Sequence, residues 1–423
     1  MATPLNPYWQ RLLRGSGMVL SLKVLGALSG YAFVYLMVKT MGKEGYGHFE
    51  LVFTFLSLAG VVARWGYDGL VVRELPAHKG QWQEQKRILA GSFLLVTGFA
   101  LLLSILLVLS RGLLSNIFHA PALEHSLLYV AVLLLPWSWF QLQSDVWRAQ
   151  NNMLAYGLWQ YGSLTFVASI LLLLFQAHSP ILYIFLALLP FIPWIIKSWI
   201  PLFGVSWKEA WSHAKVHFPT ATVFFVSSLL YTVLMWSDTL LIGYFLDESS
   251  VGVYRVAYKV STLIIFAQFA VNAQLAPDIS RYWAKRKIDS LQNAVKRIAW
   301  INTVISVPAF VVLFAGAPFF LGFFGSDFAL YADLLRVLAI GQLSNALCGP
   351  VLYLLNMTGN EKAARNTLIL GVIVNILGNI LLIPWLGLLG SAVATSFTIV
   401  LWNVWALREV YKKTGIRTFL FWR

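Results

Sequence analysis

The sequence has one cysteine in 423 residues, Cys348, and this residue lies within an apolar run. A single cysteine excludes an intrachain disulfide, so we interpret Cys348 as a packing residue. Charge is also scarce: Asp, Glu, Lys and Arg together make up 11% of the chain, whereas 59% of its residues are hydrophobic. Because soluble globular domains usually carry about 25% charged residues, this composition excludes a soluble protein.

Patterns that carry enzyme chemistry are missing too. The seven histidines are scattered in predicted loops or near the ends of apolar runs. The sequence contains no cluster with metal-ligand spacing, no catalytic constellation and no glycine-rich loop of the kind that cradles phosphates. We therefore expect no metal, no cofactor and no ATP-driven pump. We also expect no cleavable signal peptide, because Lys23 interrupts the first apolar run and no small-residue cleavage site precedes it.

Apolar runs fill the chain instead. Each is close to the roughly 20 residues that a helix needs to cross a hydrocarbon core about 30 Å thick. Helices are the expected element, because the runs lack the alternation of barrel strands and because backbone groups in lipid must be satisfied within their own segment. The sequence thus predicts an all-α polytopic membrane protein with about twelve transmembrane helices. Their approximate bounds are 17–40, 47–72, 88–112, 126–149, 154–176, 181–203, 220–246, 252–276, 296–321, 332–356, 365–384 and 388–411.

Lys and Arg, which outnumber Asp and Glu by 31 to 17, are distributed unevenly around these spans. With the N-terminus inside, the inner segments hold most of the cations, including the cluster Lys285–Lys287. The outer loops hold only Lys39, Lys43 and Arg111. The positive-inside bias then predicts that both termini are cytoplasmic, in the inner or plasma membrane of the cell. Basic loops also account for the net charge of +14 without nucleic acid as a partner.

An internal sequence similarity indicates that the chain consists of two related halves. Gly47–Phe49 and Gly252–Tyr254 each follow an apolar run and a polar turn. We expect a six-helix bundle at 1–203, an interfacial linker at 204–219 and a second six-helix bundle at 220–423. Because six is even, both bundles enter from the same side, and a pseudo-two-fold axis along the membrane normal is expected to relate them.

The linker has the character of a helix that lies in the membrane interface. Trp207 and Trp211 are four residues apart, with Lys208 and Lys215 on other faces. Such a helix buries its aromatic face at the level of the headgroups. Its role is either structural anchoring or recognition of a membrane lipid.

Glycine and aromatic motifs follow one another in a distinctive order. They are Met41–Phe49, Asp238–Gly243, Val251–Tyr258, Leu275–Pro277, Asn356–Gly359, Ile383–Pro384, Gly387 and Gly390–Ala392. In this order they resemble the polysaccharide flippases of the multidrug/oligosaccharidyl-lipid/polysaccharide exporter superfamily. The likeness covers essentially the whole chain. Arg148–Asn152 departs from it, since a glycine and more basic residues are expected there.

The resemblance implies a flippase that moves a polyprenyl-diphosphate-linked oligosaccharide from the inner to the outer leaflet by alternating access, for O-antigen, capsule or a similar surface polymer. Diphosphate and sugars cannot cross hydrocarbon unaided, so a cationic, water-filled cleft between two bundles is the expected route. Three alternatives stay open: a drug or metabolite antiporter of the same superfamily, a membrane glycan polymerase or ligase, and a scaffold that partners glycan-assembly enzymes. The short outer loops argue against the polymerase or ligase.

Four cations within the spans are candidates for contacting an anionic substrate. Arg255 and Lys259 lie four residues apart on one helical face, where like charges repel each other. They either bind the diphosphate or an acidic sugar of the substrate, or extend their charged ends to the outer membrane surface. Arg64 lies deeper in its span, although Asp68, four residues on, can pair with it. Lys23 either reaches the same cleft or extends to the cytoplasmic surface.

Asp238 is a carboxylate inside an otherwise apolar run. Charges at bilayer depth are costly and usually face a protein-lined or watery interior. We expect Asp238 to be either a coupling-cation or proton site, or a counter-ion to Arg255 or Lys259. Amides within the spans either hydrogen bond to sugars or join neighbouring helices. These amides are Gln268, Asn272, Asn302, Gln342, Asn345, Asn375 and Asn379.

Overall fold

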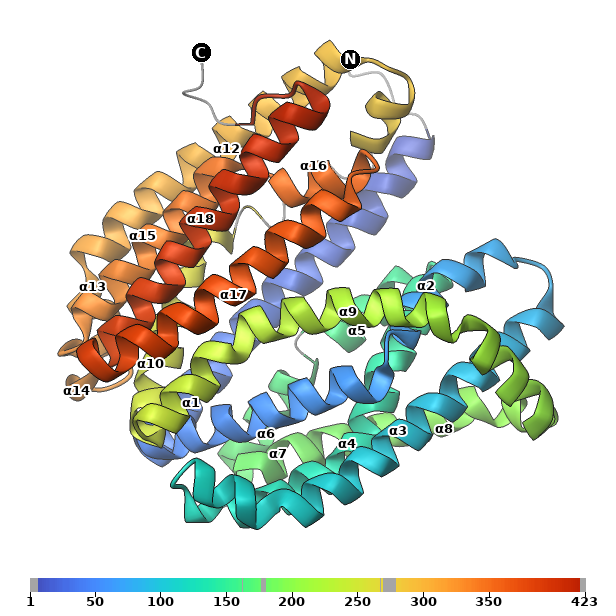
Figure 1. Ribbon diagram of the computed structural model, residues 1–423, viewed down its shortest axis with the longest axis horizontal. Helices are drawn as coiled ribbons and strands as arrows, with labels where there is room; N and C mark the ends of the chain where they lie inside the picture. The colour runs from blue at the N-terminus through green and yellow to red at the C-terminus, as the bar shows by residue number, and fades with distance from the viewer. Residues whose placement is uncertain (1–6, 162, 176–179, 267, 269–278, 419–423) are drawn as a thin grey trace. The chain divides into compact units, whose positions relative to one another are not determined.

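The computed structural model describes the chain except for residues 1–6, 162, 176–179, 267, 269–278 and 419–423, and every regular element in the described part is a helix (Figure 1). The predicted all-α class is confirmed. The chain forms two compact units, Met1–Thr232 and Val233–Arg423. The linker predicted at 204–219 stays a prediction. Asn272 and the motif Leu275–Pro277 lie outside the described residues.

The first unit begins with a long helical stretch that is interrupted at Gly42. Gly42 has φ +69°, a left-handed conformation that glycine adopts readily because it has no Cβ. The turn predicted between residues 40 and 47 therefore falls at this break, with one helical segment on each side of Gly42. The helices of this unit are α1 (Pro7–Arg64), α2 (Tyr67–Ala77), α3 (Trp82–Ile117), α4 (Pro121–Ala149), α5 (Met153–Gln160), α6 (Ser163–Phe175), α7 (Pro180–Leu188), η1 (Leu189–Phe191), α8 (Ile192–Trp199), η2 (Ile200–Gly204) and the first part of α9 (Trp207–Phe245).

A second break divides the span that was predicted as one run over 47–72. Trp65 and Gly66 have φ values of +41° and +75°, and α2 starts just after them. A Cβ on Gly66 would lie 2.0 Å from the carbonyl oxygen of Ala221 in α9. The Trp65 ring stacks on Phe225 at 4.2 Å, and its Nε1 donates to Thr222 Oγ1 at 3.1 Å. Close contact with α9 therefore accompanies the break, which local hydropathy does not indicate.

Helix α4 is the centre of the first unit. It packs on α1, α2, α3, α5, α7 and α8. Proline at the start of the helix suits a position whose amide lacks an intrahelical partner. Its buried residues lie on several faces, including Leu127, Leu134 and Phe140, as expected for a helix with neighbours on all sides.

The second unit is organised around α18, which packs on α15, α16 and α17. Small residues let these helices approach closely, as is common in membranes. A Cβ on Gly341 of α15 would lie 2.9 Å from Ser396 Cα of α18. The helices are the last part of α9, α10 (Glu248–Ser261), η3 (Thr262–Ile265), α12 (Ile288–Ala315), α13 (Ala317–Gly322), α14 (Ser326–Ala329), α15 (Ala332–Cys348), α16 (Val351–Met357), α17 (Glu361–Leu386) and α18 (Leu388–Thr414).

The chain is a multi-pass membrane protein. Within the described residues, eight helices are long and apolar enough to span a membrane, or up to ten if each bent pair counts as one span. One of the eight is α1, which contains two predicted spans joined at Gly42. The result is consistent with about twelve spans in two bundles, a count that stays a prediction. Helix α9 runs unbroken through Pro219, so the predicted interfacial segment forms its first turns.

Candidate functional site

Asp238 is the centre of a buried hydrogen-bond network in the second unit, and only 4% of the residue is exposed. Its Oδ2 accepts hydrogen bonds from the Tyr254 hydroxyl at 2.8 Å and from Thr395 Oγ1 at 2.9 Å. Its Oδ1 accepts one from Asn379 Nδ2 at 3.0 Å. Four helices, α9, α10, α17 and α18, thus meet at one carboxylate.

Further amide and hydroxyl groups surround these contacts. Ser237 Oγ donates to Asn375 Oδ1 at 2.7 Å, and Asn379 Nδ2 also donates to the Asn375 carbonyl at 2.9 Å. Ser391 Oγ donates to Asn379 Oδ1 at 2.6 Å. All of these residues are buried. We call Ser237, Asp238, Tyr254, Asn375, Asn379, Ser391 and Thr395 the Asp238 network.

Helical spacing and one tight turn assemble the network from distant parts of the sequence. Asn375 and Asn379 are four residues apart on α17, and Ser391 and Thr395 are four apart on α18, so each pair occupies one helical face. Gly387, with φ +58°, joins the two helices. Because α17 and α18 pack along their length, the two faces meet.

On the other side of the carboxylate, a capped helix start brings α10 against α9. The Asp247 side chain accepts a hydrogen bond from the Ser250 amide at 2.7 Å, an N-cap that fixes where α10 begins. Tyr254 follows on the second turn of α10 and reaches Asp238 across the hairpin. The N-cap at Asp247 and the hydrogen bond to Asp238 therefore together determine where the Tyr254 phenol lies.

The chemistry of the Asp238 network is that of oxygen ligands around one negative charge. The groups that bond to the carboxylate are uncharged hydroxyls and an amide. Carboxylate, hydroxyl and amide oxygens suit hard cations. The described residues contain no group of three or more His, Cys, Asp or Glu that could hold a metal ion. The arrangement suits a proton or a monovalent cation rather than a transition metal.

Arg255 adjoins the network on α10. Its guanidinium carbon lies 4.2 Å from the centroid of the Trp236 ring and 5.6 Å from that of Tyr258. Trp236 and Asp238 are two residues apart, so α9 presents them on different faces. Lys259 lies one turn beyond Arg255 and is likewise half-buried. The two roles left open for Asp238, a cation or proton site and a counter-ion to Arg255 or Lys259, stay predictions.

Arg64 is held by an acid across the break in the first unit. Its Nε lies 3.0 Å from Asp68 Oδ2, and the two side chains are 12% and 15% exposed. Within the described part of the chain, Arg64 Nη1 is buried without a hydrogen-bond partner. The pairing expected as an alternative for Arg64 therefore forms, and one donor of the guanidinium remains unmatched.

Lys23 also contacts an aromatic ring, since its Nζ lies 5.0 Å from the centroid of Tyr161. Arg64 and Lys23 belong to the first unit, and Arg255, Lys259 and Asp238 to the second. A cationic cleft that all of them line stays a prediction. The sequence reasoning assigned no role to Tyr254, Ser391 and Thr395. The signal for the latter two is their spacing of four residues, matched by the amide pair before Gly387.

Comparison with known proteins places this geometry in context. Residues 12–283 match the family described as Polysaccharide biosynthesis protein, and residues 224–381 match MatE. The chain is similar to the probable low-salt glycan biosynthesis flippase Agl15 of Haloferax volcanii, with 29% identity over 195 residues, 45% of this chain and 41% of that protein. It is also similar to the probable flippase AglR of the same organism, with 27% identity over 182 residues, 42% of this chain and 38% of AglR. The chain thus spans about two fifths of the length of these relatives.

A solved structure shows the same fold. The lipid II flippase MurJ, in an inward closed conformation, superposes with a TM-score of 0.72 at 16% identity, covering 94% of this chain and 87% of MurJ. At this identity the likeness concerns the fold alone. The family match covers more than half of the sequence, and the chain therefore belongs to the polysaccharide biosynthesis protein family.

Proposed function

We propose that this protein is a flippase for polyprenyl-diphosphate-linked oligosaccharides, which it moves from the inner to the outer leaflet during synthesis of a surface polysaccharide. The observation that carries the proposal is the family match over residues 12–283. The similarity to two proteins named as flippases supports it, and so does a fold shared with a lipid II flippase. A polar headgroup of this size needs a protein-lined route through hydrocarbon.

The diphosphate is the part of the substrate that the cations recognise. Arg255 and Lys259 on one face of α10 offer two positive charges one turn apart. The Trp236 ring orients the Arg255 guanidinium, which can form paired hydrogen bonds to phosphate oxygens. Arg64 and Lys23 are the corresponding candidates in the first unit. Alternating access of the two bundles would then expose these groups to each side of the membrane in turn.

We assign to Asp238 the coupling between ion binding and the conformational change that moves the substrate. Binding of a proton or a monovalent cation neutralises the carboxylate, and its release restores a buried charge. If one conformation stabilises the neutral form more than the other does, ion binding shifts the equilibrium between them. The four helices that meet at Asp238 connect this charge to the packing of the second bundle. An ion gradient, the membrane potential or both can then drive transport.

A reconstituted system tests the proposal. Purified protein is placed in vesicles with a fluorescent polyprenyl-diphosphate-linked oligosaccharide, and a membrane-impermeant quencher reports its transfer between leaflets. We expect transfer that depends on a sodium or proton gradient. Arg64→Ala, Arg255→Ala and Lys259→Ala are expected to slow transfer at normal protein levels. Arg336→Ala is the control, because Arg336 forms a local pair with Asp333 at 2.7 Å. Normal transfer in all three variants would remove the site assignment.

The same preparation separates the rivals. Export of a cationic dye without glycan transfer would indicate the antiporter, which the MatE match favours. Elongation of the glycan without transfer would indicate a polymerase or ligase. A scaffold would transfer nothing in vesicles, although surface glycan in cells would depend on its presence. Reporter fusions to both ends of the chain test the expected cytoplasmic termini and the location in the inner or plasma membrane.

A further inference from the structure

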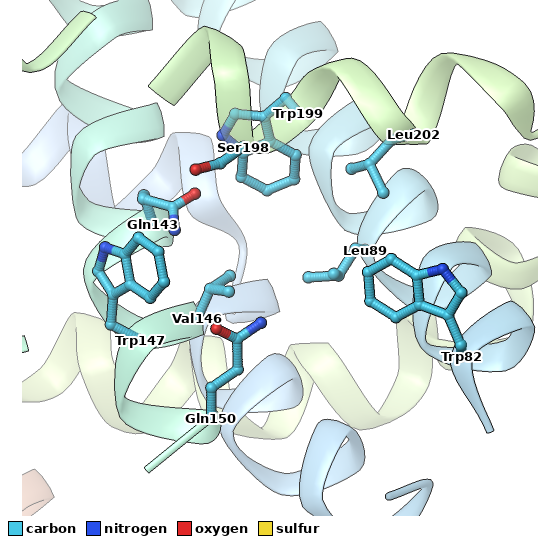
Figure 2. Close-up of a pocket in the computed structure, with 9 residues that line it drawn as sticks. All are labelled: Trp82, Leu89, Gln143, Val146, Trp147, Gln150, Ser198, Trp199 and Leu202. Atoms are coloured by element: carbon cyan, nitrogen blue, oxygen red, sulfur yellow. The ribbon is translucent and has the colours of Figure 1, made fainter. Parts of the chain in front are cut away.

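A small pocket lies among helix ends of the first unit, and none of the five candidate residues lines it. Its wall comes from the start of α3, the end of α4 and the α8–η2 segment. Figure 2 shows the side chains arranged around an open centre. The cavity volume is about 190 Å³. The distribution of Lys and Arg predicts that these helix ends face the cytoplasm.

The lining combines aromatic rings with uncharged polar groups. Six of the nine lining residues are of these two kinds, and the other three are aliphatic. The six are Trp82, Trp147, Trp199, Gln143, Gln150 and Ser198. No charged side chain is among the nine. An ionic ligand would therefore find no counter-charge in the wall.

Gln143 is the residue that points to a ligand. The residue is 2% exposed, and its amide is directed into the pocket (Figure 2). Neighbours such as Ser144, which donates to Gln160 Oε1, are paired. Within the described part of the chain, by contrast, Gln143 makes no side-chain hydrogen bond. Buried amides are normally hydrogen-bonded, so an unpaired one that faces a cavity calls for a polar occupant.

Two of the tryptophans also contact side chains that do not line the pocket. Trp199 stacks on Phe93 with ring centroids 4.6 Å apart, and Lys86 Nζ lies 5.3 Å from the centroid of Trp82. In the described structure, the indole Nε1 atoms of Trp147 and Trp199 are buried without a hydrogen-bond partner. These two nitrogens are enclosed by the protein, so Trp147 and Trp199 offer the pocket their apolar ring surfaces.

These features select one class of ligand. An apolar occupant would leave the Gln143 amide unpaired, and an ion would lack a partner. An uncharged ring with hydroxyl groups satisfies the site, because its C–H face packs on indole while its hydroxyls exchange hydrogen bonds with the amides and Ser198. The volume is below the roughly 300–1,000 Å³ of sites for drug-sized ligands, which suits a single ring.

We propose that this pocket binds one neutral pyranose ring. Two sources carry that chemistry on the cytoplasmic side: a sugar of the lipid-linked oligosaccharide before transport, and the headgroup of a neutral glycolipid in the same leaflet. The first source rests on the proposed function, whereas binding of the ring does not. In either case the pocket is a sugar site distinct from the cations that contact the diphosphate.

Ligand-observed NMR tests the binding. The full chain in sugar-free nanodiscs is titrated with methyl glycosides of neutral hexoses. In Gln143→Leu we expect binding about tenfold weaker, since one hydrogen bond to a buried group is lost. Gln150→Leu at the exposed mouth should weaken binding less. Gln160→Leu, which lies outside the pocket, is the control. Equal binding to wild type and Gln143→Leu would overturn the proposal, and so would occupancy by alkyl compounds but by no glycoside.

A stability measurement separates a binding role from a structural one. Replacing an unpaired buried amide by an apolar side chain of similar size should leave the midpoint of thermal unfolding equal to or above that of the unliganded wild type. A lower midpoint, with glycoside binding restored on cooling, would show that Gln143 acts through the fold and would overturn its assigned role.

Competition identifies the source. Displacement of the methyl glycoside by the lipid-linked oligosaccharide, together with slower transfer in Gln143→Leu, would assign the ring to the cargo. Displacement by a glycosyl diacylglycerol with unchanged transfer would assign it to a resident lipid. Glycoside binding by a wild-type protein that transfers no oligosaccharide would support the pocket and contradict the proposed function.

Discussion

Asp238 and Arg64 are both charged groups inside predicted spans, yet the two units treat them differently. Asp238 of α9 accepts hydrogen bonds from two uncharged hydroxyls and one amide on three other helices. Arg64 is paired with an acid on its own stretch of chain, across a helix break. An ion pair cancels charge within the protein, whereas neutral partners leave the charge to be matched by a proton or cation. The two units therefore satisfy a buried charge in different ways, the second with uncharged hydrogen-bond donors and the first with an opposite charge.

The largest expected effect concerns the break that positions Arg64 and Asp68. Gly66→Ala would introduce a Cβ 2.0 Å from the Ala221 carbonyl oxygen at a residue with φ +75°. We expect a loss of about 3 kcal/mol of unfolding free energy, from overpacking and from the unfavourable backbone conformation. Gly80→Ala is the matched control, because Gly80 has φ +90° but nothing within 4 Å of the added Cβ. Denaturant unfolding in detergent measures both, and equal losses would show that the α9 contact is unimportant.

The next effect concerns the coupling role that we propose for Asp238. Asp238→Asn keeps the size of the side chain and removes its charge, so binding of the driving ion should no longer favour one conformation. We expect gradient-driven transfer to fall about 100-fold, the upper range of coupling between two sites. Asp333→Asn is the control, since Asp333 is 74% exposed and pairs locally. Unchanged gradient dependence in Asp238→Asn would exclude Asp238 as the coupling site.

A double-mutant cycle sharpens the contrast with Arg64. Removing either partner of a half-buried pair leaves the other charge without its match. For Arg64→Gln and Asp68→Asn we expect a coupling energy of about 1 to 2 kcal/mol in thermal unfolding, between the values for exposed and buried pairs. If Arg64 also contacts substrate, Arg64→Gln should slow transfer more than Asp68→Asn does. Additive losses of stability would show that the interaction between Arg64 and Asp68 does not stabilise the fold.

The smallest effect concerns the aromatic support of Arg255. Trp236→Leu removes a ring 4.2 Å from the guanidinium but leaves Asp238 and its partners in place. Cation–π contacts contribute about 0.5 to 2 kcal/mol, so we expect a loss of several-fold in transfer rate. Trp236→Phe should recover part of that loss because phenylalanine retains a ring face. A rate in Trp236→Leu equal to that of wild type would show that the ring does not orient Arg255.

Local spacing is enough to account for some pairs, because both members lie on one helix. Arg336 and Asp333 lie 2.7 Å apart, and Arg148 and Asp145 lie 3.8 Å apart. Spacing of three or four residues is enough to bring such side chains together. The partners of Asp238 could not be predicted in this way, because Tyr254 and Thr395 are separated from it by 16 and 157 residues. Only the packing of α9, α10, α17 and α18 brings these residues together.

The sequence by itself determined that the chain is a helical membrane protein, because a composition this apolar leaves the backbone no other means of satisfying its polar groups in lipid. Motif order also identified the family. Three features were decided only by the tertiary structure. They are the hydrogen-bond partners of Asp238, the helix break at Gly66 where the chain contacts α9, and the position of the unpaired Gln143 amide in a tryptophan-lined pocket. Hydropathy indicates whether a residue prefers lipid or water. Hydrogen bonds between helices depend on the rotation of each helix about its axis and on its depth in the membrane, and helix packing fixes both.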